Sequence, residues 1–328
     1  MPSSHRRIAL ATGLAALVLA TTATWAQTAS SWPNRPVRIV NPASPGGTAD
    51  ALTRIVADKL SADLGQPFIL DFRAGANGII GNDHVAKALP DGYTLLLCNS
   101  AMVANASLYT KLPYDTAKDF APVSHFFETP YFLFVSTKLE ARSLRELVAL
   151  ARNAPGKLTY SSSGIGSTPH LTGVQFAQKA GTSLMHVPYK GSAPAVTATA
   201  SGETDLLFMS LPATRKLVED GRLRLLGTTS AERSSFAPEA PTIAEAGLPP
   251  LVASAWFGFC APAATPVDVQ ERFAAALVRA MAQPDVRQRF HDAGAVPTAN
   301  NPAAFRAFFQ KSITDTASVV KASGARLE

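Results

Sequence analysis

The chain has 328 residues, of which 47% are hydrophobic and only 16% are charged. A chain this apolar and this weakly charged is neither disordered nor fibrous, and its length suffices for about two domains with cores of their own. The formal net charge of +6 would suit a nucleic-acid or membrane partner only if the basic residues were clustered.

The N-terminus has the pattern of a secretory signal. Arg6 and Arg7 precede an apolar run from Ile8 to about Leu19, and small residues continue to Ala26. This run is shorter than the about 20 apolar residues that span a bilayer, so we expect a signal peptide over residues 1–26 rather than a transmembrane helix. Its removal leaves 28 basic and 24 acidic residues, a net charge of +4, without a basic stripe. We therefore expect an exported protein with no nucleic-acid partner and no stable membrane insertion.

The following segment alternates predicted strands and helices. Strands are predicted over residues 37–40, 67–72 and 93–98, with helices over 49–64 and 79–88 between them. This β-α-β-α-β order predicts a doubly wound, mostly parallel sheet.

The pattern changes after residue 120. Residues 121–135 form one β-prone stretch that is broken only near Pro130, and a second alternating series follows. No Ser/Gly-rich linker separates the two series, so we expect two similar α/β halves joined by crossing strands. The predicted elements are strands over 157–161, 184–187, 205–209, 223–228 and 253–260, helices over 143–153, 170–179, 267–281 and 302–322, and a loop over 188–194.

The two cysteines are Cys98 and Cys260. An even number of cysteines in an exported chain permits a disulfide. Each cysteine lies in an apolar, strand-like run, where an unpaired cysteine behaves as a small buried hydrophobe. Two buried thiols are therefore the favoured prediction, and the pairing is left open. No CxxC or HExxH motif is present, so no metal site is expected.

The glycine-rich loops do not match nucleotide or catalytic motifs. No Lys follows the glycines of Ser44–Thr48, as a P-loop requires, and neither Gly75–Gly81 nor Gly164–Pro169 has the spacing of a dinucleotide fingerprint. No serine lies in a GxSxG motif, and His170 has no visible acid partner. A secreted hydrolase that uses a serine among residues 161–163 remains only an alternative.

These loops share one position, because each follows a strand and opens a helix. A helix N-terminus offers unsatisfied N–H groups and a partial positive charge, and glycine allows a ligand to approach the backbone closely. Such loops are also common without any ligand. With one in each half, at Ser44–Thr48 and Ser161–Thr168, they are compatible with a shared carboxylate site that needs no Arg or Lys.

Nine stretches, in order from residue 32 to near the C-terminus, resemble the Bug family, the periplasmic solute receptors of tripartite tricarboxylate transporters. They include SPGGTADALTR, PGKLTYSSSGIGSTPHL, HVPYKGSAPAV and SAWFGFCAPAATP. The resemblance implies a two-domain α/β fold of the periplasmic-binding-protein (Venus flytrap) type. It places domain 1 at residues 27–130 and 255–328, and domain 2 at 131–254.

The resemblance also implies a receptor without catalysis, cofactor or metal. Its partners would be a small carboxylate and the large and small integral membrane subunits of a transporter, and we expect a monomer. A receptor that serves a signalling partner is the main alternative. The expected ligand-binding residues are Ala43, Ser44, Gly46, Gly47, Thr48, Asp50, Ser100, Ser162, Ser163, Gly164, Ser167, Thr168, His170, Tyr189, Met209, Ser210 and Trp256.

Two departures from the family pattern concern the ligand. Asn41 replaces an apolar residue at the end of the first strand, and Met209 stands where family members often have an Asp. The missing carboxylate argues against an amino-acid ligand. Met209, together with Tyr189 and Trp256, favours an aromatic or apolar mono- or dicarboxylate, unless Met209 only packs in the core.

Overall fold

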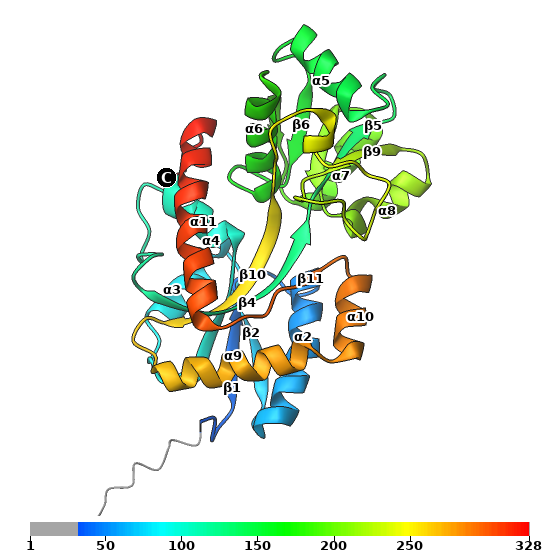
Figure 1. The fold of residues 1–328 in the computed structure, drawn as a ribbon. Helices are drawn as coiled ribbons and strands as arrows, with labels where there is room; N and C mark the ends of the chain where they lie inside the picture. The colour runs from blue at the N-terminus through cyan, green and yellow to red at the C-terminus, as the bar shows by residue number, and fades with distance from the viewer. Residues whose placement is uncertain (1–31, 328) are drawn as a thin grey trace, which may run out of the picture. The chain divides into compact units, whose positions relative to one another are not determined.

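The computed structural model describes residues 32–327, so the predicted signal peptide lies outside the described residues. The compact unit that begins at Arg35 carries all the strands and helices described here. Its strands form two sheets, one of six strands and one of five, and helices pack against both (Figure 1).

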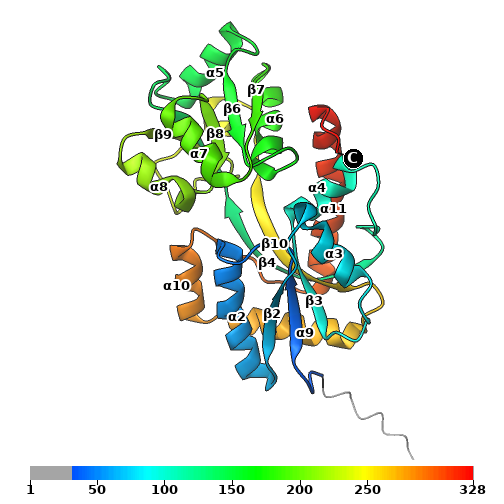
Figure 2. The same ribbon diagram turned by 180° about the vertical axis from the view of Figure 1, so that it is seen from behind.

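The first sheet has the strand order β11-β4-β10-β3-β1-β2. Strand β1 is parallel to β2 and β3, whereas β10 is antiparallel to β3 and β4, and β11 is antiparallel to β4. Helix α2 lies beside α10 and packs on α9, and α4 packs on α11 (Figure 2). The elements are β1 (Val37–Asn41), α2 (Thr48–Leu64), β2 (Phe68–Phe72), η2 (Ala76–Gly78), α3 (Ile79–Ala86), β3 (Thr94–Asn99), α4 (Ser100–Leu108), β4 (Phe120–Pro130), β10 (Ser254–Pro262), α9 (Val267–Met281), α10 (Pro284–Asp292), β11 (Val296–Pro297) and α11 (Pro302–Ser323).

The second sheet has the strand order β7-β6-β8-β5-β9. Strand β6 is parallel to β7 and β8, and β5 is antiparallel to β8 and β9. The elements are β5 (Phe132–Ser136), α5 (Leu144–Asn153), β6 (Thr159–Ser162), α6 (Thr168–Ala180), β7 (Met185–Pro188), α7 (Ser192–Ser201), β8 (Leu206–Met209), α8 (Leu211–Glu219), β9 (Leu223–Thr228) and η3 (Ala244–Ala246).

The chain crosses between the sheets twice, as the sequence predicts. Only Tyr131 separates β4 from β5, and the chain returns at β10, whose Ser254 lies opposite Pro130. We call β4 and β10 the crossing strands. Each antiparallel pair of the described sheets contains a crossing strand or β5, which explains why each doubly wound sheet also has an antiparallel part. The α/β two-domain fold class is confirmed, and the domain boundaries near residues 131 and 254 stay a prediction.

Cys98 and Cys260 form a disulfide, so the prediction of two buried thiols is wrong. Cys98 lies opposite Gly258 in the β3–β10 ladder, which puts Cys260 diagonally across on the same face. The two Cα atoms are 5.9 Å apart, within the range that a disulfide spans. Both residues are completely buried, as predicted. The pairing depends on two strands that are neighbours in space but 162 residues apart in sequence.

Candidate functional site

The strand order places the predicted loops at the switch point of each sheet. From β1 the chain continues to β2 on one side, whereas from β3 it continues toward the other side of the first sheet. In the second sheet, the chain likewise continues from β6 to β7 on one side and from β8 to β9 on the other. Ligands of open α/β sheets bind outside the carboxyl ends of the strands at such points. Most of the expected ligand residues lie in the loops after β1, β6 and β8 or in the strand ends and first helical turns beside them.

The loop between β1 and α2 is held from within by Asp50. The backbone N–H of Gly46 donates to Asp50 Oδ2 at 2.8 Å, and Arg54 Nε donates to Asp50 Oδ1 at 2.7 Å. The carboxylate is buried, and both of its oxygens are engaged within the loop and helix. Residues 43–48 are exposed, whereas Asp50 positions them.

The loop between β2 and α3 has an unusual backbone. Residues 75–78 all have positive φ angles, and Ala76 at 47° and Asn77 at 53° are not glycines. The Asn77 side-chain amide donates to Asn105 Oδ1 at 2.7 Å, which ties the loop to α4. A Cβ atom on Gly78 would lie 3.3 Å from Cβ of Pro42, so this loop packs directly on the loop after β1. Strained backbone of this kind concentrates at functional sites, and we add residues 75–78 to the candidate site.

Two histidines hold the loop between β6 and α6. The hydroxyl of Ser162 lies 2.6 Å from His186 Nε2 and accepts a hydrogen bond from the N–H of Gly164 at 3.1 Å. The N–H of Gly166 donates to His170 Nδ1 at 3.0 Å, and the two imidazole rings are stacked with centroids 4.0 Å apart. Burial lowers the pKa of each histidine to about 4, so both are neutral at neutral pH. His170 thus supports the loop, and His186 is a supporting residue absent from the expected set.

Helices α2, α7 and α8 begin without a side-chain cap. Their N-cap residues are Gly47, Gly191 and Ser210, and none of the three makes a capping hydrogen bond through a side chain. In contrast, Ser167 caps α6 through the N–H of His170. The N–H groups at the start of α2, and those of Leu211 and Ala213 at the start of α8, therefore remain available for an anion, whereas Pro212 has no N–H group.

A hydrogen bond joins the N-termini of α4 and α6. Ser100 Oγ and Thr168 Oγ1 are 3.1 Å apart, and Gly166 packs against Leu108 of α4. Burial raises the pKa of Tyr131, whose hydroxyl also hydrogen-bonds to Thr168, to about 12. These contacts connect the loop after β6 to α4, which in turn contacts the loop of residues 75–78 through Asn105.

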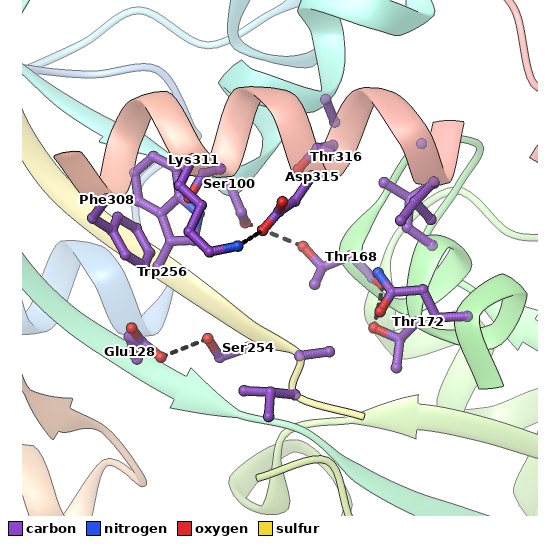
Figure 3. Close-up of a pocket in the computed structure, with 18 residues that line it drawn as sticks. Ser100, Glu128, Thr168, Thr172, Ser254, Trp256, Phe308, Lys311, Asp315 and Thr316 are labelled. Carbon is purple, nitrogen blue, oxygen red and sulfur yellow. Dashed lines mark hydrogen bonds and ion pairs between the residues drawn. The ribbon is translucent and has the colours of Figure 1, made fainter. Parts of the chain in front are cut away.

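Next to this hydrogen bond lies a cavity of about 410 Å³, which we call the Glu128 cavity (Figure 3). It is bounded by α4, α6, α11, the two crossing strands and the segment just before β10. Of the expected ligand residues it contains Ser100, Thr168 and Trp256, and the others do not line it. Its lining residues are Ser100, Ala104, Glu128, Gly166, Thr168, Leu171, Thr172, Gln175, Val252, Ala253, Ser254, Trp256, Phe308, Lys311, Ser312, Asp315, Thr316 and Val319.

The residues expected to contact an aromatic ligand lie apart. Met209 is 3% exposed and belongs to a core cluster with Phe132 and Phe134. Trp256 packs in a different cluster, with aromatic residues of α11. The Tyr189 hydroxyl donates to Glu203 Oε1 at 2.8 Å, and burial is the main cause that raises its pKa to about 12.

The serines of residues 161–163 do not form the site of a hydrolase. The Ser161 hydroxyl is buried and donates to the carbonyl of Ala195 at 3.0 Å. Ser162, although close to His186, is also buried, and none of the described carboxylates hydrogen-bonds to that histidine. The third group that orients a catalytic base is therefore missing from the described residues.

The chain matches a family model over residues 52–325, and that model is described as the tripartite tricarboxylate transporter family receptor. The chain belongs to this family. The protein is accordingly a periplasmic solute-binding receptor of the Bug type and not an enzyme.

Similar proteins agree with this assignment. BugT of Bordetella pertussis is 35% identical over 302 residues, which cover 92% of this chain and 93% of BugT. An R. palustris protein solved with adipate is 35% identical, with a TM-score of 0.78, and the match covers 90% of this chain and 100% of that one. MatC from Rhodopseudomonas palustris, solved with bound malate, is 29% identical with a TM-score of 0.74, over 88% and 100% of the two chains. None of the helices within residues 32–327 of this receptor is long and apolar enough to cross a membrane.

Proposed function

We propose that this receptor captures a small dicarboxylate with an aliphatic body between the loops after β1 and β8. The observation that carries the proposal is the pair of uncapped helix N-termini, of α2 and α8, at the switch points of the two sheets. Backbone N–H groups at such ends bind carboxylates without a cationic side chain. The exposed Gly46 and Gly47 leave open space above the backbone, which allows a carboxylate to approach.

The expected ligand residues divide into two roles under this proposal. Residues 43–48 and the start of α8 would contact the ligand. Asp50 and His170 would position the loops, because their polar atoms already bond to loop N–H groups. Ser162 belongs with them, since its hydroxyl bonds within its own loop.

An aliphatic body is favoured over an aromatic one. The aromatic alternative depends on Met209 and Trp256, whose side chains pack in separate cores. Adipate, which was solved with the R. palustris protein, has two carboxylates joined by methylene groups. Met209 and Ser210 also bring no carboxylate toward the ligand, which remains unfavourable for an amino acid.

Delivery to a transporter completes the proposal. The export signal of residues 1–26 would bring the receptor to the periplasm. There the receptor, as a monomer, would deliver its ligand to the large and small membrane subunits. A signalling partner is the alternative, and co-purification of the tagged receptor with either kind of partner distinguishes the two.

Calorimetric titration of the mature protein with adipate, malate, benzoate and aspartate tests the ligand class. We expect adipate to bind most tightly. Tight binding of aspartate or benzoate alone would show that the ligand is not an aliphatic dicarboxylate free of amino groups. No binding of any of these carboxylates would contradict the whole proposal.

The role of the α2 N-terminus can be tested at Thr48. Proline is tolerated at the first position of a helix but removes its N–H, and Gly47 has the extended φ and ψ (−82° and 169°) that a residue before proline needs. Thr48→Pro should weaken adipate binding by at least about tenfold, since hydrogen bonds to charged groups contribute about 1.5–3 kcal/mol. Thr48→Ala, which keeps the N–H, should lose less. Equal affinities of Thr48→Pro and wild type would refute this role.

A further inference from the structure

The Glu128 cavity is separate from the loops assigned to the carboxylate. None of residues 42–48, 75–78 or 209–210 lines it. Its walls come instead from the crossing strands and the segment before β10 on one side, and from α4, α6 and α11 on the other (Figure 3).

The pairing of the crossing strands determines which side chains face this cavity. Trp256 of β10 lies directly opposite Glu128 of β4, so the indole and the carboxylate project from the same face of the sheet. Ser254, two residues before Trp256, lies on that face too, and its hydroxyl donates to Glu128 Oε2 at 2.6 Å. Strand register thus places a carboxylate next to an aromatic ring at the cavity wall.

The charges around the cavity leave Glu128 without a cationic partner. Lys311 forms its ion pair with Asp315, four residues later on α11. His125 Nε2 lies 3.5 Å from Glu128 Oε1, but burial lowers the pKa of His125 to about 4, so it is neutral at neutral pH. No Lys or Arg among residues 32–327 forms an ion pair with Glu128, although its side chain is only 29% exposed. Two carboxylates against one ammonium group give the cavity a net negative charge.

Aromatic rings complete the wall beside this carboxylate. The rings of Trp256 and Phe308 meet edge to face with centroids 5.5 Å apart, and His125 stacks on Phe308 at 4.5 Å. Aromatic faces attract cations, most strongly where water is partly excluded. A half-buried carboxylate beside an aromatic wall is the combination that recognises organic ammonium ions.

We propose that the Glu128 cavity binds a small organic ammonium ion, with its cationic group between the Glu128 carboxylate and the ring pair of Trp256 and Phe308. The volume of about 410 Å³ lies within the range of small-molecule sites. The hydroxyls of Ser100 and Thr168 at the cavity lining add hydrogen-bond acceptors. This ligand is opposite in charge to the carboxylate proposed for the loops, so the inference does not depend on that function.

The test uses a pair of probes that differ chiefly in charge. The mature protein is titrated with 2-phenylethylammonium and with 3-phenylpropanoate, followed by calorimetry and by tryptophan fluorescence, since Trp256 lines the cavity. We expect saturable binding of the ammonium ion only. Glu128→Gln should weaken it about tenfold, whereas Glu140→Gln, the same change at an exposed position, should leave it unchanged.

Two outcomes overturn the proposal: no saturable binding of the ammonium ion up to roughly 10 mM, or equal affinity of Glu128→Gln and wild type. Should Glu128→Gln fail to fold, Lys311→Met takes its place, because Lys311 is exposed on α11. Loss of this like charge should raise the affinity about threefold, as expected for a partly exposed charge pair. An unchanged or reduced affinity of Lys311→Met would equally contradict the site.

Discussion

Acidification should destabilise this receptor through His170, and His170→Asn should remove that contribution. The side chain is 4% exposed, and burial lowers its pKa from 6.5 to about 4. Since each pKa unit corresponds to about 1.4 kcal/mol, the full effect is about 3 kcal/mol. The unfolded chain binds the proton first as the pH falls below 6.5, so stability decreases from there and the loss is complete below about 4. Protonation of Nδ1 would also abolish its hydrogen bond from Gly166.

Urea unfolding at a series of pH values measures this effect. The side-chain oxygen of the introduced asparagine could still accept the Gly166 N–H but would not titrate, so the variant should lose about 3 kcal/mol less than wild type between neutral pH and about 4. His186 shares part of this difference, because the charge of His170 also lowers the pKa of His186. His291→Asn, at an exposed position, serves as the control. Identical pH dependence of wild type and His170→Asn would refute the reasoning.

Three further predictions concern the loops and the disulfide. Gly166→Ala should cost about 2–3 kcal/mol in urea unfolding, because φ is 77° and the added Cβ overlaps a side chain of α4, whereas Gly181→Ala, with open space around it, should cost about 1 kcal/mol. Thiol titration of the unreduced, denatured protein should find no free thiol, and replacing Cys98 and Cys260 with Ala should lower the unfolding free energy by up to about 5 kcal/mol; two reactive thiols would contradict this. Asp50→Ala should weaken adipate binding about tenfold with an unchanged circular dichroism spectrum; unchanged affinity would argue against its positioning role.

Amphipathic elements could be predicted from the sequence with good bounds. Helix α9 has the predicted bounds, and α11 extends only one residue beyond them. Both present a repeated apolar stripe that includes Phe273 and Leu277 in one case and Phe305 and Phe309 in the other. A period of this kind is a local property, so one sequence suffices to recognise it.

Four of the described helices have no counterpart among the predicted elements: α4, α7, α8 and α10. Helix α4 is buried along most of its length, and α7, which begins inside the predicted loop 188–194, consists mainly of small residues. Neither has the strongly polar face that marks an amphipathic helix. Helices α8 and α10 are short, and each has a proline in its first turn. In a single sequence, a short segment with a proline is also typical of a loop.

The candidate site could be predicted as a set of loops but not as a set of contacts. Glycine, serine and threonine after each strand identify the loops, whereas the link between Ser162 and His186 joins two neighbouring strands. The pairing of Glu128 with Trp256 requires the register of strands that are far apart in the chain. Residues 75–78 carried a visible signal in their two glycines, but the positive φ of Ala76 and Asn77 is a property of the folded backbone.

A single continuous segment of the chain, between β4 and β10, forms the second sheet. β4 ends at Pro130, β10 begins at Ser254, and these two residues lie opposite each other in one ladder. A short turn in place of residues 131–253 would leave every strand of the first sheet in its register, with its disulfide between β3 and β10 intact. The strands of the first sheet would then form without the segment that builds the second sheet, and we expect this shortened chain to fold by itself. Exchange of residues 131–253 for another segment would be a direct route to receptors with new ligands.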